Sequence, residues 1–234
     1  MKIFLRIMLC AVMLIYVFQP VLAAETDSAG FETETYFEET FSSDDYRMDA
    51  FAMETAEAVD GRLMLIPKNT GDRYIMMRGE DKVENVQFQK VEVTLYPVQE
   101  CPLTITALTW QSPRHLLILQ NDGRIYEIDN PSPLRYKSGS EEITYESGEE
   151  MHFEFYLFSD ASVNDNDLYN VKYRVFLNGS EIELQGGEFS GDRGFNTSGC
   201  ANRIRISING ECPDGEAIYV DDVRISSLLR NPFC

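Results

Sequence analysis

Strict alternation of apolar and polar residues is the feature that most limits the fold of this chain. Apolar residues occupy every second position in four segments, at residues 91–95, 153–157, 171–177 and 204–208. A period of two is typical of β-strands that bury one face, and it differs from the period of 3.6 of an amphipathic helix. Helical periodicity is almost absent from the rest of the chain. The pattern therefore predicts a protein built of β-strands.

Short turn signals separate these segments, among them Asn121-Asp122-Gly123, Asn178-Gly179 and Asn209-Gly210. Asn, Asp and Gly tolerate a positive φ, so these sequences favour tight connections between antiparallel strands. About a dozen strands without alternating helices predict an all-β fold, a two-sheet antiparallel β-sandwich. We find no internal repeat or linker. We therefore expect residues 37–234 to form one sandwich domain with a C-terminal tail, preceded by a flexible acidic leader over residues 24–36.

Residues 1–23 have the features of a secretory signal peptide. Lys2 and Arg6 precede an uncharged apolar stretch over residues 7–18, and small residues follow it near Ala23. We expect cleavage after Ala23, which makes the mature protein secreted or otherwise extracytoplasmic. The alternative is an uncleaved membrane anchor, but the apolar stretch is shorter than the ~20 residues that span a bilayer. No stable membrane insertion is expected after cleavage.

The chain is strongly acidic, with 20 lysines and arginines against 39 aspartates and glutamates and a formal net charge of -19. Binding to a nucleic-acid backbone needs clustered cations that displace counterions. Docking on anionic lipid needs such cations as well. We therefore expect neither a nucleic-acid partner nor an anionic membrane surface as a partner.

Four cysteines remain after signal cleavage, and in an exported chain they predict two disulfides. Cys200 and Cys212 are close in sequence, but a strand predicted between them would hold its ends roughly 20 Å apart. Bridged Cα atoms lie only about 4.4–6.8 Å apart. The following strand returns towards Cys200, where the C-terminal tail can bring Cys234. The predicted pairs are therefore Cys200–Cys234 and Cys101–Cys212.

Three segments match patterns that recur together in one family of β-sandwiches. They are Glu38-Glu39-Thr40-Phe41 with Val59-Asp60-Gly61-Arg62-Leu63, then Tyr173-Arg174-Val175-Phe176-Leu177-Asn178-Gly179, and finally Ile218-Tyr219-Val220-Asp221-Asp222-Val223-Arg224-Ile225. In order and spacing the three segments resemble the concanavalin A-like lectin/glucanase superfamily. The second segment, Tyr173 to Gly179, is similar to a hairpin of laminin G-like members. The resemblance covers about residues 37–226. It implies a jelly-roll sandwich and, by itself, no catalytic activity.

Catalytic motifs are mostly missing. The branch of this superfamily that cleaves β-glucans has an E-x-D-x-x-E strand, which places two carboxylates on one face across the scissile bond. The nearest match is Glu127-Ile128-Asp129, but the second Glu is absent and Pro131 would end the strand. His152 is expected to be a packed or surface residue, and nothing near His115 would orient its ring. We therefore predict that the protein is not an enzyme.

Aromatic residues make up 12% of the chain and could form a carbohydrate site. Sugar rings stack on exposed aromatic rings, while their hydroxyl groups bond to polar side chains. The candidate ligand-binding residues are Trp110, Tyr126, Glu154, Tyr156 and Phe158. The alternative is that most of these rings pack between the sheets.

An oxygen-rich segment is a candidate calcium site. Ca²⁺ takes six to eight oxygen ligands, and several could come from Asp160, Asn164, Asp165, Asn166 and Asp167. The segment departs from an EF-hand loop, because Asp165 stands at the position of the usual glycine. A solvated acidic loop is the alternative. Structural Ca²⁺ is therefore the one candidate cofactor, and the sequence gives no sign that another is needed.

Three hypotheses for the function stay open. The first, which the resemblance implies, is a secreted non-catalytic module that binds a glycan or polysaccharide through aromatic stacking and a polar rim. The second is a structural or protein-adhesion module that binds a cell-surface protein and has no sugar site. The third is a divergent polysaccharide hydrolase or lyase, which ranks last because no paired-carboxylate strand is found. We favour the first hypothesis.

Overall fold

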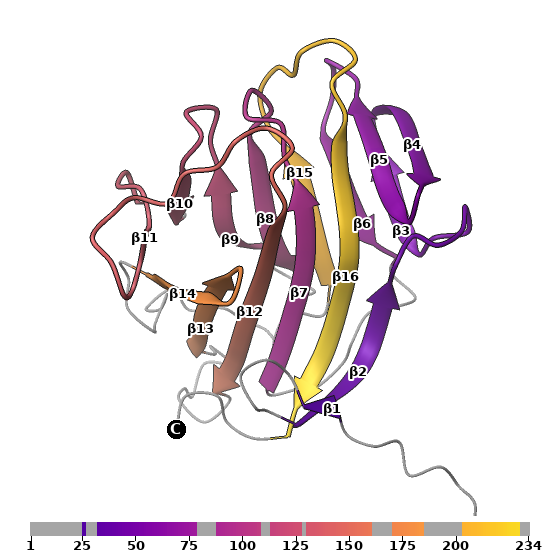
Figure 1. The fold of residues 1–234 in the computed structure, drawn as a ribbon. Coiled ribbons are helices and arrows are strands. Elements are labelled where there is room, and N and C mark those ends of the chain that lie inside the picture. Colours follow the sequence, from indigo (N-terminus) through magenta and orange to yellow (C-terminus); the bar gives the residue numbers. More distant parts are fainter. Residues whose placement is uncertain are drawn as a thin grey trace, which may run out of the picture.

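The structure of the protein is a computed structural model that describes residues 25–26, 32–78, 88–108, 113–127, 130–160, 170–184 and 203–229. In these residues the regular secondary structure consists of β-strands alone, and the strands form two antiparallel sheets. Figure 1 shows the larger sheet in front of the smaller one. The predicted all-β, two-sheet antiparallel sandwich is therefore confirmed. Within the same residues no helix is long and apolar enough to cross a membrane.

The larger sheet has ten strands, and its central members come from distant parts of the chain. Its main path, in spatial order, is β1 (Glu25–Thr26), β2 (Glu32–Glu39), β16 (Ile218–Leu228), β7 (Phe88–Tyr96), β12 (Met151–Asp160), β13 (Asn170–Leu177), β14 (Ser180–Glu183) and β11 (Arg135–Tyr136). Beside β16 the sheet branches through β5 (Arg62–Pro67) to β4 (Met53–Val59). This order places β7 and β12 side by side at the centre of the sheet.

The smaller sheet has six strands and covers the inner face of the larger one. Its order is β10 (Ile125–Glu127), β9 (Pro113–Leu119), β8 (Leu103–Leu108), β15 (Arg203–Ile208), β6 (Arg73–Met77) and β3 (Met48–Phe51). β10 ends at Glu127. The sequence predicted that a strand ends here and is followed by a turn before Pro131.

The core lies between the sheets and contains the apolar residues of the alternating segments. From β7 and β12 they are Val91, Val93, Leu95, Phe153, Phe155 and Leu157, all buried; from β15 they are Ile204, Ile206 and Ile208. Successive side chains of a strand point to opposite faces. The alternate residues of β7 and β12 therefore lie on the outer face of the larger sheet.

A disulfide joins the segment before β8 to the segment after β15. Cys101 and Cys212 are bonded, with their Cα atoms 4.7 Å apart and both residues buried. This is one of the two pairs expected from the sequence. The other pair, Cys200–Cys234, lies outside the described residues and stays a prediction.

Candidate functional site

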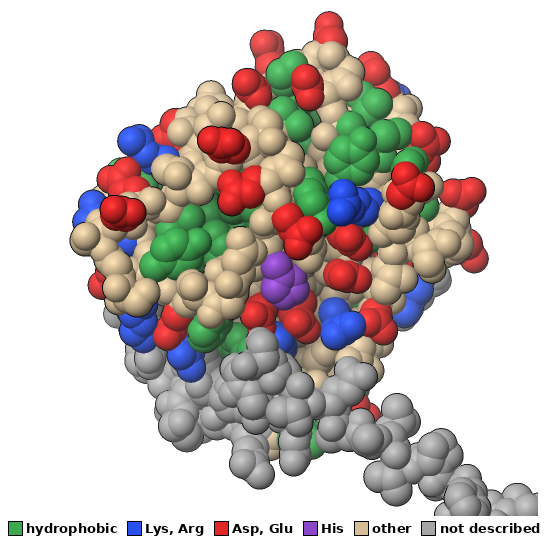
Figure 2. Space-filling model, viewed as in Figure 1, with side chains coloured by type: hydrophobic (Ala, Val, Ile, Leu, Met, Phe, Trp, Pro, Cys, Tyr) green, Lys and Arg blue, Asp and Glu red, His purple; other side chains and the backbone are tan. Residues whose placement is uncertain are grey.

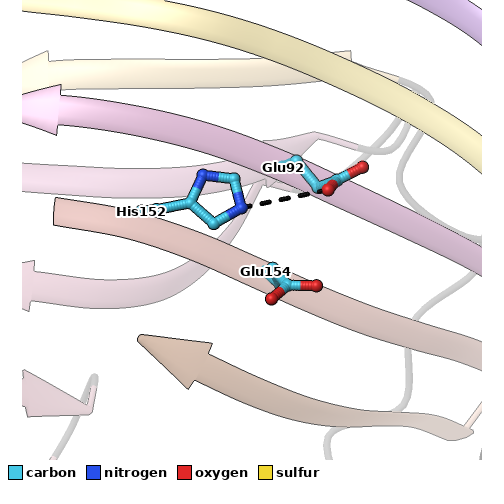
Figure 3. Close-up of side chains that lie close together, drawn as sticks. All are labelled: Glu92, His152 and Glu154. Atoms are coloured by element: carbon cyan, nitrogen blue, oxygen red, sulfur yellow. Dashed lines mark ion pairs between the residues drawn. The ribbon is translucent and has the colours of Figure 1, made fainter. Parts of the chain in front are cut away.

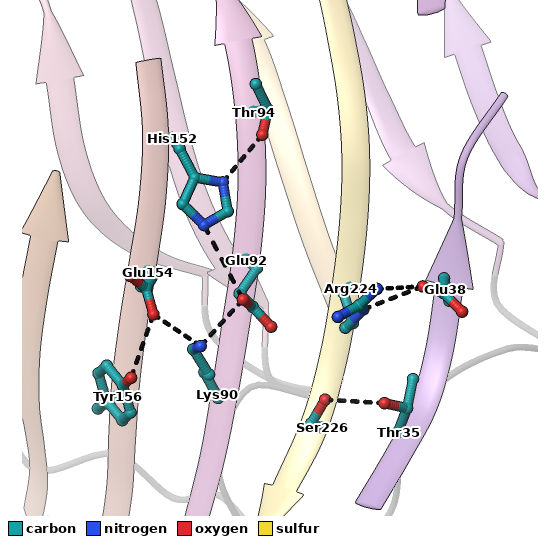
Figure 4. Close-up of polar contacts among 10 residues, drawn as sticks. All are labelled: Thr35, Glu38, Lys90, Glu92, Thr94, His152, Glu154, Tyr156, Arg224 and Ser226. Atoms are coloured by element: carbon teal, nitrogen blue, oxygen red, sulfur yellow. Dashed lines mark hydrogen bonds and ion pairs between the residues drawn. The ribbon is translucent and has the colours of Figure 1, made fainter. Parts of the chain in front are cut away.

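Six polar side chains gather on the outer face of the larger sheet. β7 contributes Lys90, Glu92 and Thr94, and β12 contributes His152, Glu154 and Tyr156. The antiparallel register places Glu154 opposite Glu92, Tyr156 opposite Lys90 and His152 opposite Thr94. Cross-strand pairs of this kind lie close enough for direct side-chain contact. Figure 4 shows the resulting network across the two strands.

Lys90 is the centre of this network. Its ammonium nitrogen lies 2.9 Å from Oε1 of Glu92 and 2.6 Å from Oε2 of Glu154. The side chains of Lys90 and Glu154 are 2% and 5% exposed, so this is a buried ion pair. Burial by itself would lower the pKa of Lys90, but the hydrogen bond to Glu154 and the charge of Glu92 outweigh it and raise that pKa above its ordinary value. Lys90 is therefore a fixed cation that holds both carboxylates.

His152 forms the exposed edge of the network. Its Nδ1 lies 2.9 Å from the hydroxyl oxygen of Thr94, and its Nε2 lies 3.9 Å from Oε1 of Glu92. Its backbone N–H donates to the side-chain oxygen of Asn178 at 2.9 Å, which ties β12 to the turn after β13. The imidazole is 35% exposed and Glu92 is 15% exposed. These two groups can therefore contact a ligand without rearranging the buried part.

Tyr156 closes the buried end of the network. Its hydroxyl donates to Oε2 of Glu154 at 3.1 Å, and its ring packs edge-on against Phe176 with centroids 5.3 Å apart. The residue is 2% exposed. In this structure its hydroxyl bonds to Glu154 and its buried ring offers no free face to a sugar, so the stacking role predicted for Tyr156 finds no support in its position.

Glu92, His152 and Glu154 also have the composition of a metal-binding group. One nitrogen and two carboxylate oxygens lie within 4.8 Å of one another (Figure 3). Zn²⁺ and related ions accept such ligands at about 2.0–2.2 Å. Lys90 already bonds to both carboxylates, however, so its ammonium occupies the position of the cation. The arrangement is that of an ion-paired cluster with one more negative than positive charge while His152 is neutral.

A second polar group lies beside the first, between β7, β5 and β16. The hydroxyl of Tyr96 donates to Glu150 at 2.6 Å, and the guanidinium of Arg62 lies 3.9 Å from the centre of the Tyr96 ring. Arg62 also pairs with Asp221 at 3.6 Å. Burial and the hydrogen bond to Glu150 raise the pKa of Tyr96 to about 12. The face therefore combines an aromatic ring with fixed charges.

The surroundings of the cluster are acidic. Figure 2 shows this face of the molecule, with a histidine near its middle and acidic side chains on several sides of it. Glu38 on β2 pairs with Arg224 on β16, further along the same sheet. Acidic side chains are therefore common around the histidine, as expected for a chain with a net charge of -19.

Of the other residues predicted for ligand binding, the structure places only the side chain of Tyr126, and it lies away from this cluster. Tyr126 is on β10 of the smaller sheet, where its hydroxyl donates to Asp122 at 2.6 Å. Trp110 lies outside the described residues, and the structure describes the backbone but not the side chain of Phe158.

The candidate calcium segment is not tested by the structure. Asp160 is the last residue of β12, and its side chain is not described. Asn164, Asp165, Asn166 and Asp167 lie outside the described residues. The calcium site stays a prediction.

Sequence reasoning selected Glu154 and Tyr156 but missed Lys90, Glu92 and the polar role of His152. A signal was present, because K-x-E-x-T over residues 90–94 and H-x-E-x-Y over residues 152–156 each place three polar groups on one strand face. Recognising the site also required the pairing of the two strands, which neither motif contains.

No protein-family model matches the sequence, and a comparison with curated protein sequences also gives no match. Among solved structures, a proposed glycosyl hydrolase from Parabacteroides distasonis has a TM-score of 0.50 at 13% sequence identity, with 84% of each chain covered. The alginate lyase Aly36B has a TM-score of 0.47 at 12% identity, covering 78% of this chain and 87% of its own. The catalytic domain of a laminarinase from Thermotoga petrophila has a TM-score of 0.46 at 10% identity, covering 86% of this chain and 100% of its own.

The match to the Parabacteroides distasonis structure concerns the fold. The chain is a two-sheet β-sandwich that shares its architecture with the proposed glycosyl hydrolase from Parabacteroides distasonis. At 13% identity the likeness extends to the fold and leaves the activity of this chain to be argued from its own residues.

Proposed function

We propose that the protein binds carbohydrate on the outer face of its larger sheet, around His152 and Glu92. One observation supports this most directly: two partly exposed hydrogen-bonding side chains stand on a buried ionic network that fixes their positions. Sugar hydroxyl groups both donate and accept hydrogen bonds, so a rigid set of donors and acceptors is what selective binding of a sugar needs. The shared fold with a proposed glycosyl hydrolase supports the same ligand class.

Preorganisation is the main advantage of this site. Glu92 is held by Lys90, and His152 is held by Thr94 and by its backbone bond to Asn178. Side chains that are already ordered lose little rotamer entropy when a ligand binds, a cost of about 0.5–1.5 kcal/mol for each mobile side chain. Binding can therefore be selective even on a shallow sheet face.

The charge of the face indicates which glycans it accepts. Glu92 and Glu154 share one lysine, and further acidic side chains surround the histidine (Figure 2). Uronic acids and sulfated sugars would meet like charges there, which is unfavourable in a complex. The face therefore favours neutral polysaccharides.

Polysaccharide cleavage is a second candidate, because Glu92 and Glu154 face each other across the strand pair with oxygens within 4.8 Å. Retaining glycosidases hold their two carboxyl groups about 5–5.5 Å apart. One of the two must be protonated to act as the general acid. The ammonium group of Lys90 bonds to both carboxylates and lies between them, in the space that a glycosidic bond would have to occupy. This argues for binding rather than hydrolysis.

We also propose that the protein acts outside the cytoplasm. The buried Cys101–Cys212 disulfide supports this, because structural disulfides persist in oxidising compartments. The signal peptide predicted over residues 1–23 supports the same location.

The test is a glycan array combined with affinity electrophoresis of residues 24–234 in gels that contain neutral polysaccharides. We expect retention by at least one of them. His152→Ala and Glu92→Gln should each weaken it about tenfold, the equivalent of about 1.4 kcal/mol. Glu38→Gln is the matched control, since Glu38 is an exposed carboxylate on the same sheet that pairs with Arg224. This control should be retained like the parent protein.

Two results would contradict the proposal. Absence of retention on every glycan would favour a structural module, and equal retention of the parent and both site variants would place the binding elsewhere. The same preparations are assayed for new reducing ends and for unsaturated products. Release of either by the parent protein, abolished in Glu92→Gln, would replace binding with cleavage as the function.

A further inference from the structure

The outer face of the smaller sheet has a cleft of its own, at the ends of β6 and β15. It has a volume of about 400 Å³, and its lining includes Asp72, Arg73, Thr104, Arg205, Ser207 and Asn209. Ligand pockets typically have volumes of about 300–1,000 Å³. The cleft therefore has room for a small molecule or one unit of a larger one.

Arg73 is the most unusual group in this cleft. The residue is 8% exposed, and its Nη2 donates to the carbonyl oxygen of Gly210. Its Nε and Nη1 are buried and have no hydrogen-bond partner in the structure. A buried donor without a partner costs about 1–3 kcal/mol, and more when it belongs to a charged group. An acceptor that comes within hydrogen-bond distance of these atoms would remove this cost.

Arg205 places a second guanidinium in the same cleft. Its Nε donates to the hydroxyl oxygen of Ser207 at 2.9 Å, and its guanidinium carbon lies 3.7 Å from the centre of the Tyr74 ring. Neither of these groups is a carboxylate. The ring and the hydroxyl hold the guanidinium in place without neutralising its charge.

The lack of an ion pair at these two residues differs from other described arginines of the molecule. Arginines elsewhere pair with acids: Arg62 with Asp221, Arg78 with Asp49, and Arg174 with Glu181. In a chain with 39 acidic residues, such pairing is easily available. Among the described residues, Arg73 and Arg205 have no ion pair with any of them.

We infer that this cleft binds an oxyanion, a carboxylate or sulfate group of a small acidic compound. Arginine guanidinium groups form charge-assisted, geometrically specific hydrogen bonds with such groups. Thr104 and Asn209, which bond to each other at 2.5 Å, and Ser207 provide neutral polar contacts for the remainder of the ligand. Asp72 is exposed at this cleft and limits how much negative charge the ligand can have there.

This site is independent of the proposed carbohydrate site. It lies on the smaller sheet, and it favours anions where the face around His152 favours neutral sugars. Failure of one proposal therefore leaves the other unaffected.

The experiment is isothermal titration calorimetry of residues 24–234 with four probes at equal ionic strength: glucuronate, acetate, sulfate and glucose. We expect saturable binding of at least one oxyanion, and any binding of glucose should be unchanged in Arg205→Gln. Glucuronate binding more tightly than acetate would assign the site to a sugar acid, and sulfate binding most tightly would assign it to sulfate or its esters. Either result supports the oxyanion site.

Arg205→Gln should weaken that binding about tenfold, as expected for the loss of one charge-assisted contact of about 1.4 kcal/mol. Arg203→Gln is the control, because Arg203 lies on the same strand and outside the lining of the cleft. Circular dichroism checks that both variants are folded. Absence of saturable binding by all three oxyanions, or equal weakening by both variants, would overturn the inference.

Discussion

Replacing Lys90 with methionine tests the central structural argument. Methionine keeps most of the length and apolar volume of the lysine side chain but removes the ammonium group. The change leaves Glu92 and Glu154 directly opposite each other on neighbouring strands, without the cation that lies 2.9 Å from one and 2.6 Å from the other. Two like charges then remain on a largely buried face.

The expected loss of stability follows from burial. Removing one partner of a buried ion pair costs about 3–5 kcal/mol, because the other charge is left without compensation. Glu154 is 5% exposed and carries most of the penalty, although the Tyr156 hydroxyl still donates to it, whereas Glu92 is 15% exposed and can turn towards water. We therefore expect Lys90→Met to lower the free energy of unfolding by about 3 kcal/mol at pH 7. That loss is a large part of the roughly 5–15 kcal/mol typical of a domain.

The loss should depend on pH in one direction. In the variant, burial and the facing carboxylate raise the folded-state pKa of Glu154 above its unfolded value of about 4.3. A group with a raised folded pKa destabilises the fold as pH rises through that pKa, and the penalty disappears below the unfolded value. The difference between parent and variant should therefore shrink as the pH falls from 7 towards 4.

Urea denaturation at several pH values measures these differences. The double variant Lys90→Met with Glu154→Gln should recover at least half of the loss, because it removes the facing charge. Lys137→Met is the control: Lys137 pairs with Glu181 at 3.2 Å but is 54% exposed, so its loss should be below about 1 kcal/mol. A loss below about 1 kcal/mol for Lys90→Met, or a loss that is constant with pH, would refute the reasoning.

Three further predictions concern other parts of the molecule. Replacing Cys101 and Cys212 together by serine should lower the free energy of unfolding by about 4–5 kcal/mol in urea denaturation, because the disulfide spans 111 residues; a loss below about 1 kcal/mol would exclude the chain-entropy account. Tyr96 should titrate near pH 12 by ultraviolet absorbance and add stability that is lost as pH rises through that value, and Tyr96→Phe should remove both effects. Added Ca²⁺ should raise the melting temperature by mass action, and Asp160→Ala with Asp165→Ala should abolish the rise; identical curves with and without chelator would remove the calcium site.

The strands could be predicted because the alternation of residues within each strand shows which of its side chains are buried. The apolar residues of 91–95 and 153–157 lie in the core, as their alternation indicates. The Cys101–Cys212 pair could also be reasoned from the length of the strand before Cys212, which β15 (Arg203–Ile208) confirms.

The site could not be predicted in the same way, because its geometry comes from pairing between distant strands. Glu92 and Glu154 are far apart in sequence, and only the register of β7 with β12 brings them opposite each other. Tyr156 shows the same limit. Its alternation places the ring on the outer face, but contacts with Glu154 and Phe176 bury it, and alternation cannot report such lateral packing.

The two outer faces of the sandwich differ in how their buried charged side chains are compensated. On the larger sheet one lysine serves two carboxylates, so the excess charge is negative and the exposed groups are a histidine and a glutamate. On the smaller sheet two arginines share a cleft in which the acid, Asp72, is exposed and pairs with neither. Buried charges are stable only when they are compensated. On the larger sheet the charges compensate each other within the protein, so a neutral molecule can bind there without disturbing the ion pairs. On the smaller sheet the arginines keep hydrogen-bond donors that an external anion can satisfy.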